Sequence, residues 1–218
     1  MAAQTTAPSS YRPAGTLDAS TALLPYSGPW NRRLAAHLLR RAGFGGAPAD
    51  VDRLAALPVG AAVESLVRFP DTSRLAGGPD LVTPPAPRQR RQMRAMLGDN
   101  PTPEQLAQVR KQLGQVRRQN LIALQSWWLG RMIASPAPLQ EKMTLFWHGH
   151  FTSAVNQKGI SGQEMLMQNQ LFREYALGNV RDLTLHVSQD PAMLRYLDNN
   201  VNVKAHPNEN YARELMEL

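Results

Sequence analysis

Apolar side chains recur every three or four residues along most of this chain, which is the repeat of an amphipathic helix. The repeat and its flanking breakers predict helices over residues 31–42, 50–57, 60–69, 102–134, 138–148, 161–177, 179–188, 190–198 and 208–218. No segment shows a convincing strand pattern. We therefore predict an all-α fold, with a multi-helix, bundle-like body and a small N-terminal helical cluster.

Polar and helix-breaking residues divide the chain into four parts. Residues 1–29 are rich in Ala, Thr, Ser and Pro and are predicted to be a disordered N-terminal segment, followed by a helical cluster over 30–69. Residues 70–101 contain prolines, glycines and arginines and are predicted to be a linker, whereas residues 102–218 form the helical body. The last helix ends without a glycine, a proline or a basic final turn, so we expect the body to be truncated at its C-terminus. Its uncovered apolar face predicts either a missing C-terminal portion or self-association.

Residues typical of helix starts support these boundaries. Thr102 and Gln105 have the spacing of a capping box, and Ser161 and Glu164 repeat it. Asp190 precedes a proline, which combines an N-cap carboxylate with proline in the first helical turn. Three predicted helices therefore begin at side chains that can satisfy free backbone donors.

Composition narrows the classes of function. The chain has 218 residues, of which 43% are hydrophobic and 19% charged, so it can bury a substantial core. It contains no cysteine, which excludes disulfides, thiolate metal sites and a cysteine nucleophile. No apolar run approaches the ~18–20 residues of a membrane-spanning helix, and the N-terminus carries no recognisable export signal. We expect a cytoplasmic protein by default, or an exported one if the true N-terminus differs.

The net charge of +7 is concentrated in one stretch. Residues 88–118 carry eight basic and two acidic side chains, whereas residues 136–218 carry seven basic and nine acidic ones. The basic stretch lacks the interleaved aromatic residues on which bases stack. A solvated helix face and a basic linker explain it better, so we do not expect a nucleic-acid partner.

Histidines, acids and side-chain amides gather in the last third of the chain, and such a cluster indicates a site. If the helix over 138–148 ends at His148 and Gly149 takes the left-handed conformation, His148 and His150 face the same loop region. With Asp198 they are candidate ligands of a divalent metal ion. The alternative is that one histidine caps the C-terminus of the helix.

A second group of oxygen-bearing side chains lies between Asp198 and Glu209, and their spacing is that of a calcium loop. Val203 stands where such a loop has glycine, and Pro207 interrupts it, so an amide-rich turn between two helices is the preferred interpretation. Structural roles in helix starts, turns and buried amides are assigned to Asn169, Asp190, Asn199, Asn208, Glu209 and Arg213.

No serine elbow, phosphate-binding glycine loop or dinucleotide fingerprint occurs in the chain. The sequence therefore predicts a helical scaffold or interaction module with no assignable reaction. The alternative is a metal-assisted hydrolase or oxidoreductase. In that alternative His148 and His150 bind the metal. Glu214 or Glu217, on the polar side of the last helix, then supplies a carboxylate ligand or a general base.

Several segments together resemble a bacterial family catalogued as domain of unknown function 1800. The matching segments are Arg40–Gly45, Pro138–Phe151, Arg181–Leu183, Asp190–Leu194, Tyr196–Asn199 and Asn208–Leu218. The resemblance spans residues 31–218 and is most specific in the last segment. It implies a helical fold, a longer parent protein of which this chain is the N-terminal portion and, in many relatives, an export signal that this chain lacks. It implies no activity.

Overall fold

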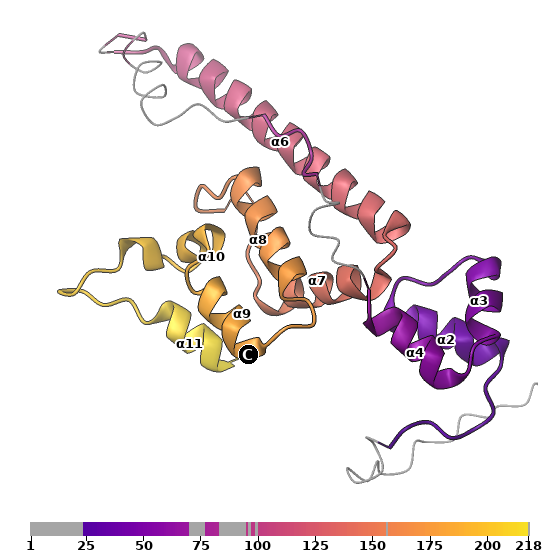
Figure 1. Cartoon of the computed structure of the whole chain (residues 1–218). Coiled ribbons are helices and arrows are strands. Elements are labelled where there is room, and N and C mark those ends of the chain that lie inside the picture. Colours follow the sequence, from indigo (N-terminus) through magenta and orange to yellow (C-terminus); the bar gives the residue numbers. More distant parts are fainter. Residues whose placement is uncertain are drawn as a thin grey trace, which may run out of the picture. The chain divides into compact units, whose positions relative to one another are not determined.

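The structure is a computed structural model that describes residues 24–69, 77–82, 95, 97–98, 100–155 and 157–217. Within these ranges the regular structure is helical and contains no strand, which confirms the predicted all-α class. The helices are α2 (Arg32–Ala42), α3 (Pro48–Ala55), α4 (Val59–Val67), α6 (Pro103–Ala134), α7 (Pro138–His150), α8 (Gly162–Glu174), α9 (Val180–Val187), α10 (Pro191–Tyr196), the 3-10 helix η2 (Asn199–Val201) and α11 (Asn210–Glu217) (Figure 1).

The chain separates into two units, Met1–Trp30 and Asn31–Leu218. The described part of the first unit, residues 24–30, has no regular secondary structure. Most of the predicted disordered segment and most of the predicted linker lie outside the described residues. The second unit contains all the helices named above, so the predicted N-terminal cluster and helical body belong to one unit.

Helices α2, α3 and α4 form the N-terminal cluster. Each helix is amphipathic and buries one apolar face, and the buried residues are Ala35, Leu39, Val51, Leu54, Ala62 and Leu66. Asn31 caps α2 by accepting a hydrogen bond from the Leu34 N–H. Both α2 and α4 contact α7, which joins the cluster to the body.

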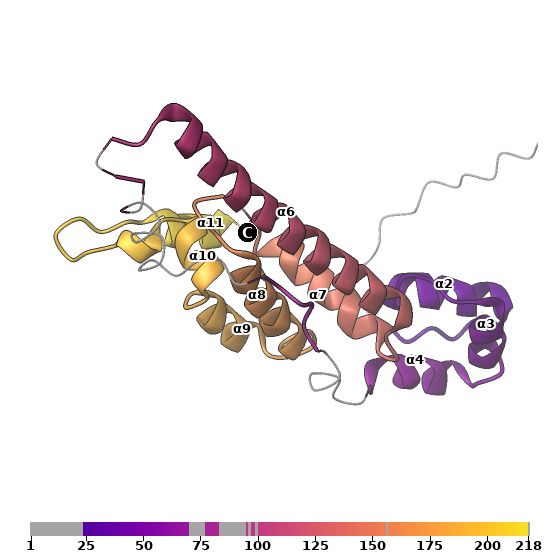
Figure 2. The same cartoon turned by 90° about the horizontal axis from the view of Figure 1, so that it is seen from above.

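Helix α6 is the longest element described, and its 32 residues span about 48 Å. Thr102 and Gln105 form the predicted capping box at its start. Within α6 only Asn120 and Leu124 are fully buried, because the first half of the helix extends past α7 and α8 (Figures 1 and 2). Among the described helices, including α6, none combines the length and apolarity needed to cross a membrane.

Two hydrophobic clusters hold the body together. The first contains Trp147, Phe151, Phe172, Leu183, Val187 and Met193. The second contains Leu124, Ile160, Met165, Leu166 and Ala192. Tyr211 and Leu215 of α11 are partly buried against the first cluster, so apolar contacts hold α11 on the body.

The end of α7 differs from the predicted one. The helix continues through Gly149 to His150, and the Phe151 N–H donates to the Trp147 carbonyl oxygen at 2.8 Å. Glycine adopts the helical and the left-handed conformation about equally well. The burial of Trp147 and Phe151 on one side of this turn favours the helical conformation at Gly149. The loop that was predicted to bring His148 and His150 together therefore does not form.

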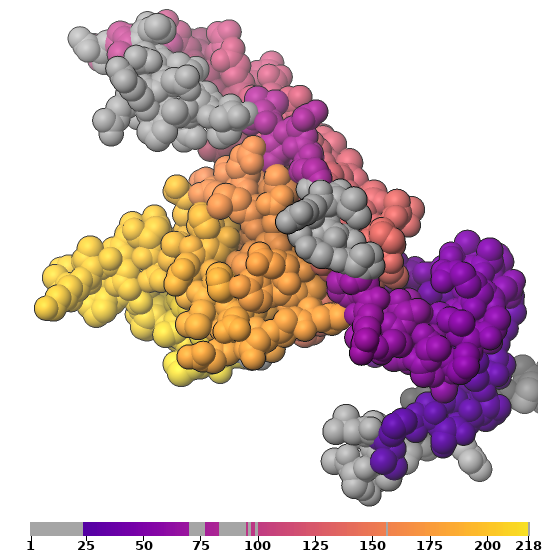
Figure 3. Space-filling model, in the orientation of Figure 1, coloured from indigo at the N-terminus to yellow at the C-terminus, as the bar shows by residue number. Residues whose placement is uncertain are grey.

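A short segment, residues 77–82, lies along α6 (Figure 3). The Asn120 side chain bonds it twice, because Oδ1 accepts from the Val82 N–H and Nδ2 donates to the Val82 carbonyl oxygen, both at 2.8 Å. Trp127 Nε1 donates to the Gly77 carbonyl oxygen at 2.5 Å. Both ends of the segment are thus tied to the half of α6 that faces the body.

Candidate functional site

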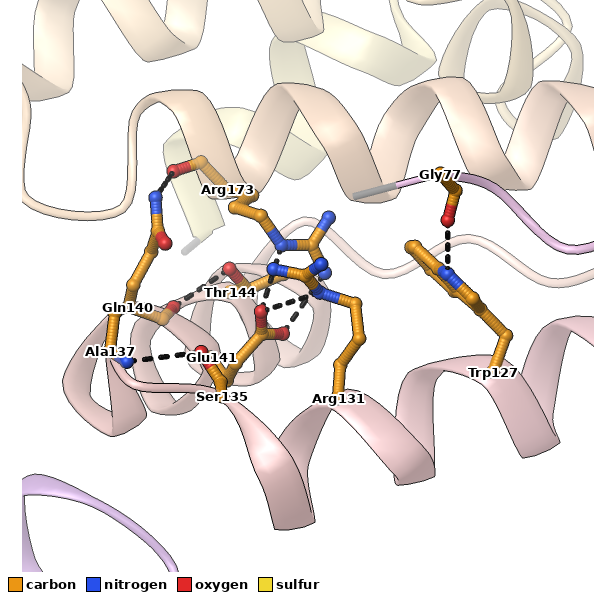
Figure 4. Close-up of polar contacts among 9 residues, drawn as sticks. All are labelled: Gly77, Trp127, Arg131, Ser135, Ala137, Gln140, Glu141, Thr144 and Arg173. Atoms are coloured by element: carbon orange, nitrogen blue, oxygen red, sulfur yellow. Dashed lines mark hydrogen bonds and ion pairs between the residues drawn. The ribbon is translucent and has the colours of Figure 1, made fainter. Parts of the chain in front are cut away.

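Three charged residues, one each from α6, α7 and α8, form an ion-pair cluster that we call the clamp: Arg131, Glu141 and Arg173 (Figure 4). Arg173 donates from Nε to Glu141 Oε1 and from Nη2 to Oε2, each at 3.0 Å, in a bidentate pair. Arg131 Nε donates to the same Oε1 at 2.9 Å. The side chains of Glu141 and Arg173 are 0% and 1% exposed, so this pair is shielded from solvent.

The two arginines set the protonation state of the clamp. Burial raises the pKa of Glu141, but the hydrogen bonds and charges of Arg173 and Arg131 outweigh it and hold the pKa below its ordinary value. Glu141 is therefore a carboxylate at neutral pH. Because both its oxygens are engaged, it ties three helices together instead of presenting a free base.

Trp127 covers the clamp from α6. The guanidinium carbons of Arg173 and Arg131 lie 5.2 and 5.8 Å from the centroid of its ring, which is cation–π distance. Arg173 Nη1 is buried and has no hydrogen-bond partner in the part of the chain that the structure describes. Gln140 donates to the Arg173 backbone carbonyl oxygen at 3.1 Å, which adds a further link between α7 and α8.

A second buried network joins the segment after α7 to α8 and α10. Ser153 Oγ donates to Gln168 Oε1 at 2.6 Å, and Gln168 Nε2 donates to Asp190 Oδ2 at 2.8 Å. The same carboxylate oxygen accepts from the Met193 N–H at 2.8 Å, so Asp190 is the N-cap of α10, as predicted. Burial raises the pKa of Asp190, although its hydrogen bonds act in the opposite direction.

Beside these networks lies a cavity of about 280 Å³, bordered by α6, α7, α8 and residues 153–155, which we call the α6–α8 cavity. Its apolar wall includes Leu121, Leu124, Val155 and Met165. Its polar side chains are Gln125, Trp128, His148, Ser153 and Asn169, and among the described residues no Asp, Glu, Lys or Arg borders it.

Two residues of this cavity carry buried polar atoms that lack hydrogen-bond partners among the described residues. Asn169 is 6% exposed, and within the described part of the chain neither its Oδ1 nor the buried Trp128 Nε1 has a hydrogen-bond partner. The His148 ring stands edge-on to Trp128 with 5.4 Å between centroids, and burial lowers the pKa of His148, which favours the neutral imidazole. Among the described residues, the other such buried atoms are Trp30 Nε1 and Arg173 Nη1.

The two histidines predicted as metal ligands border different cavities. His148 lines the α6–α8 cavity, whereas His150 lines a cavity of about 220 Å³ beside α11. Both belong to α7, where residues two positions apart point about 200° apart around the helix axis. Glu214 lines the cavity of His150. The structure thus brings His150 and Glu214 to one cavity and separates His148 from both.

The other predicted metal and catalytic residues take part in ion pairs. Asp198 accepts a hydrogen bond from Lys158 Nζ at 2.5 Å. Arg213 pairs with Glu214 at 3.0 Å and with Glu217 at 3.3 Å. In the part of the chain that the structure describes, no three His, Asp or Glu side chains form a group that could hold a metal ion. The predicted ligand set is therefore not assembled there.

Side-chain amides build the turn between α10 and α11. Asn199 Oδ1 accepts from Asn202 Nδ2, and Asn202 Oδ1 accepts from the Asn208 N–H, both at 2.9 Å. Asn208 Nδ2 donates to two backbone carbonyl oxygens just after α10, at 3.0 and 3.2 Å. Glu209 is exposed, and its backbone carbonyl accepts from the Arg213 N–H. This arrangement is that of the amide-rich turn, since the oxygens do not converge as calcium ligands do.

A protein-family model described as "Protein of unknown function (DUF1800)" matches residues 37–218. The chain belongs to the DUF1800 family. This confirms the resemblance seen in the sequence. No curated protein and no solved structure matches the chain. The clamp and the α6–α8 cavity both lie within the DUF1800 match, but the family description supplies no activity, so the function has to follow from their geometry.

Sequence reasoning missed the clamp of this DUF1800 chain. Glu141 and Arg173 are 32 residues apart, and no local motif links them. A signal does exist, because Glu141 shares a helix face with the buried Thr144. A charge on a buried face requires a buried partner, and Arg173, next to the buried Phe172, was a candidate for it.

Proposed function

We propose that this DUF1800 chain is a non-catalytic binding scaffold, in which α6, α7 and α8 form rigid walls and the cavity between them receives a ligand. The observation that supports this proposal is a difference in hydrogen bonding between the clamp and the cavity. Both oxygens of the clamp carboxylate are engaged by arginines, whereas Asn169 Oδ1 and Trp128 Nε1 at the cavity have no partner in the described ranges. Unpaired buried polar groups are costly, so they point to a ligand that completes them.

The clamp gives the cavity the support that a binding site requires. Glu141 and Arg173 join α7 to α8, and Arg131 joins the end of α6 to both. Binding groups are effective when rigid elements hold them in place. A bidentate buried ion pair between two of the walls provides such support, because separating the walls would break both of its charge-assisted hydrogen bonds.

The hydrogen bonds around the cavity favour binding over acyl transfer. A nucleophilic serine donates its hydroxyl proton to a base, and both Ser153 and His148 border the cavity. Ser153 Oγ instead donates to Gln168 Oε1 at 2.6 Å. The metal-assisted alternative is also less well supported, since His150 and Glu214 share a cavity without a third ligand among the described residues.

The proposal is tested by metal analysis and thermal melting of protein purified without a histidine tag. We expect no stoichiometric metal, and no increase in Tm on adding Zn²⁺, Mn²⁺ or Mg²⁺, because a ligand raises Tm when it binds the native state. Stoichiometric metal that is lost in His150→Ala, but retained in the matched control His186→Ala at an exposed histidine, would refute the scaffold.

Rigidity of the walls is tested by amide hydrogen exchange of the whole chain. We expect the amides of α7 and α8 to exchange through global unfolding, since the clamp and the first hydrophobic cluster both hold these helices. Fast, local exchange throughout α7 or α8 under native conditions would show that the walls are not rigid, and the scaffold would then be rejected.

A further inference from the structure

We propose that the α6–α8 cavity binds a small uncharged molecule with a single ring as its apolar body and a primary carboxamide, or an equivalent donor and acceptor group, as its head. This inference deepens the proposed binding function and rests on it. It adds the class of ligand, which follows from the size, the walls, the unpaired groups and the charge of the cavity.

The size of the cavity limits the ligand to one ring. Its volume is about 280 Å³. An apolar protein cavity of about 150 Å³ accepts benzene, whereas drug-sized ligands occupy sites of ~300–1,000 Å³. The α6–α8 cavity therefore has room for a benzene-sized ring and one substituent of a few atoms.

The walls favour a flat apolar body. Leu121, Leu124 and Val155 supply aliphatic surface, and Met165 adds a thioether that packs well against aromatic rings. The Trp128 ring borders the same cavity and prefers edge-on or offset contacts with another ring. A ring inserted here replaces water with apolar contacts on several sides.

The unpaired groups specify the head of the ligand. Asn169 Oδ1 requires a donor, and Trp128 Nε1 requires an acceptor. A neutral His148 ring offers one donor and one acceptor. A primary carboxamide carries an N–H donor and a carbonyl acceptor on one planar group, so it can complete this mixed set. A pure acceptor or a pure donor would leave part of it unpaired.

The described lining disfavours ionic ligands. None of the described residues that border the cavity is Asp, Glu, Lys or Arg, and the clamp carboxylate is already paired with two arginines. A carboxylate or an ammonium group would lose its hydration in the cavity without gaining a counter-charge. A neutral head is therefore preferred over an anionic or cationic head of the same size.

Four probes test the contributions of the ring, the neutral head and charge: benzamide, benzoate, benzylammonium and toluene. All four contain one benzene ring and differ in its substituent. Affinities are measured by calorimetry or by titration of the ¹H–¹⁵N spectrum, in which Trp128→Phe identifies the indole signal of Trp128. We expect saturable binding of benzamide with a shift of that signal, and affinity at least tenfold higher than for the two ionic probes or for toluene. A tenfold ratio is what a single additional hydrogen bond provides.

Two substitutions on α8 provide the matched test. Asn169→Leu removes the amide and is expected to weaken benzamide binding about tenfold, while toluene binding stays equal or improves. Gln170→Leu makes the same kind of change at the next, exposed position and should leave both affinities unchanged. Melting curves verify that each variant is folded.

The inference is overturned by any of three results with folded protein. These are no saturable benzamide binding, benzoate or toluene binding as tight as benzamide, and Asn169→Leu binding benzamide like the wild type. The first result would mean that ordered water alone completes the polar groups. If the metal and exchange experiments above still give the expected results, the scaffold stands and the ligand class alone is rejected.

Discussion

Trp127 and Trp128 are neighbours on α6, yet their indole N–H groups differ in hydrogen bonding. Trp127 Nε1 donates to the Gly77 carbonyl, and its ring lies over the guanidinium groups of Arg131 and Arg173. Trp128 Nε1 has no hydrogen-bond partner among the residues that the structure describes, and its ring borders the α6–α8 cavity. Consecutive helical residues point about 100° apart, so one turn of α6 serves both regions.

We interpret this difference in hydrogen bonding as a difference in role between the clamp and the cavity. The clamp engages both oxygens of its carboxylate and stabilises the contact of three helices. The cavity leaves groups unpaired, which costs about 1–3 kcal/mol for each buried donor or acceptor. Proteins depart from full hydrogen bonding mainly at functional sites. We therefore propose that the clamp serves folding and that the cavity serves binding.

The largest loss of stability is expected when one charge of the clamp is removed and its partner remains. Glu141→Leu leaves Arg173 buried without its counter-charge, so the free energy of unfolding should fall by about 3–5 kcal/mol. Urea denaturation measures this loss. The double variant Glu141→Leu with Arg173→Met removes both charges, so its free energy of unfolding should fall less than that of Glu141→Leu alone.

The control is Glu174→Gln, at the exposed position next to Arg173, which should change the free energy of unfolding by less than about 0.5 kcal/mol. A loss below about 1 kcal/mol in Glu141→Leu would contradict the role of the clamp.

Removing the buried N-cap of α10 should lower the free energy of unfolding more than removing the exposed N-cap of α9. Asp190→Ala removes the acceptor of the Met193 N–H and the partner of Gln168, so we expect a loss of about 2 kcal/mol. Asn179→Ala removes the exposed cap of α9 and should cost about 1 kcal/mol. Equal losses in urea denaturation would show that the Gln168 contact adds nothing.

Acid should weaken the clamp. Because the folded pKa of Glu141 lies below its ordinary value of 4.5, its contribution to stability is present above that pH and is lost as pH falls through the folded pKa. The double variant Glu141→Leu with Arg173→Met lacks this contribution. The difference in free energy of unfolding between wild type and double variant should therefore shrink below pH 4.5. A difference that stays constant would disprove the pairing.

The smallest effect is expected at the cavity. Burial lowers the folded pKa of His148 below 6.5, so its neutral form is favoured in the native state and stability is lost as pH falls from 6.5 through the folded pKa. His148→Phe keeps an aromatic ring and should remove this part of the pH dependence, as followed by thermal melting. Parallel curves for wild type and His148→Phe would contradict burial of the imidazole.

Local sequence signals were sufficient for the class of fold and for the starts of several helices. The capping box of Thr102 and Gln105 and the cap at Asp190 could be predicted because each depends on residues close in sequence. The end of α7 could not, since Gly149 permits either conformation and tertiary packing of Phe151 decides between them.

The candidate site was less predictable for the same reason. His148 and Asn169 were selected from the sequence as special, but their common cavity depends on the packing of α7 against α8. The partners Glu141 and Arg173 are distant in sequence, and local periodicity contains no information about which buried charges meet. The sequence therefore located part of the polar site, whereas the structure places His148 and His150, which the sequence grouped together, at different cavities.

One matched pair of substitutions tests the separation of folding from binding most directly. Asn120 and Asn169 are both buried, at 4% and 6% exposure. Asn120 forms two hydrogen bonds with the Val82 backbone, whereas Asn169 Oδ1 has no partner within the described residues. The free energies of unfolding of Asn120→Leu and Asn169→Leu are compared with wild type by urea denaturation. We expect a loss of about 1–3 kcal/mol for Asn120→Leu, and no loss or a gain of up to about 1 kcal/mol for Asn169→Leu. Equal losses at the two positions would show that Asn169 serves folding, and the account of the cavity as a binding site would be wrong.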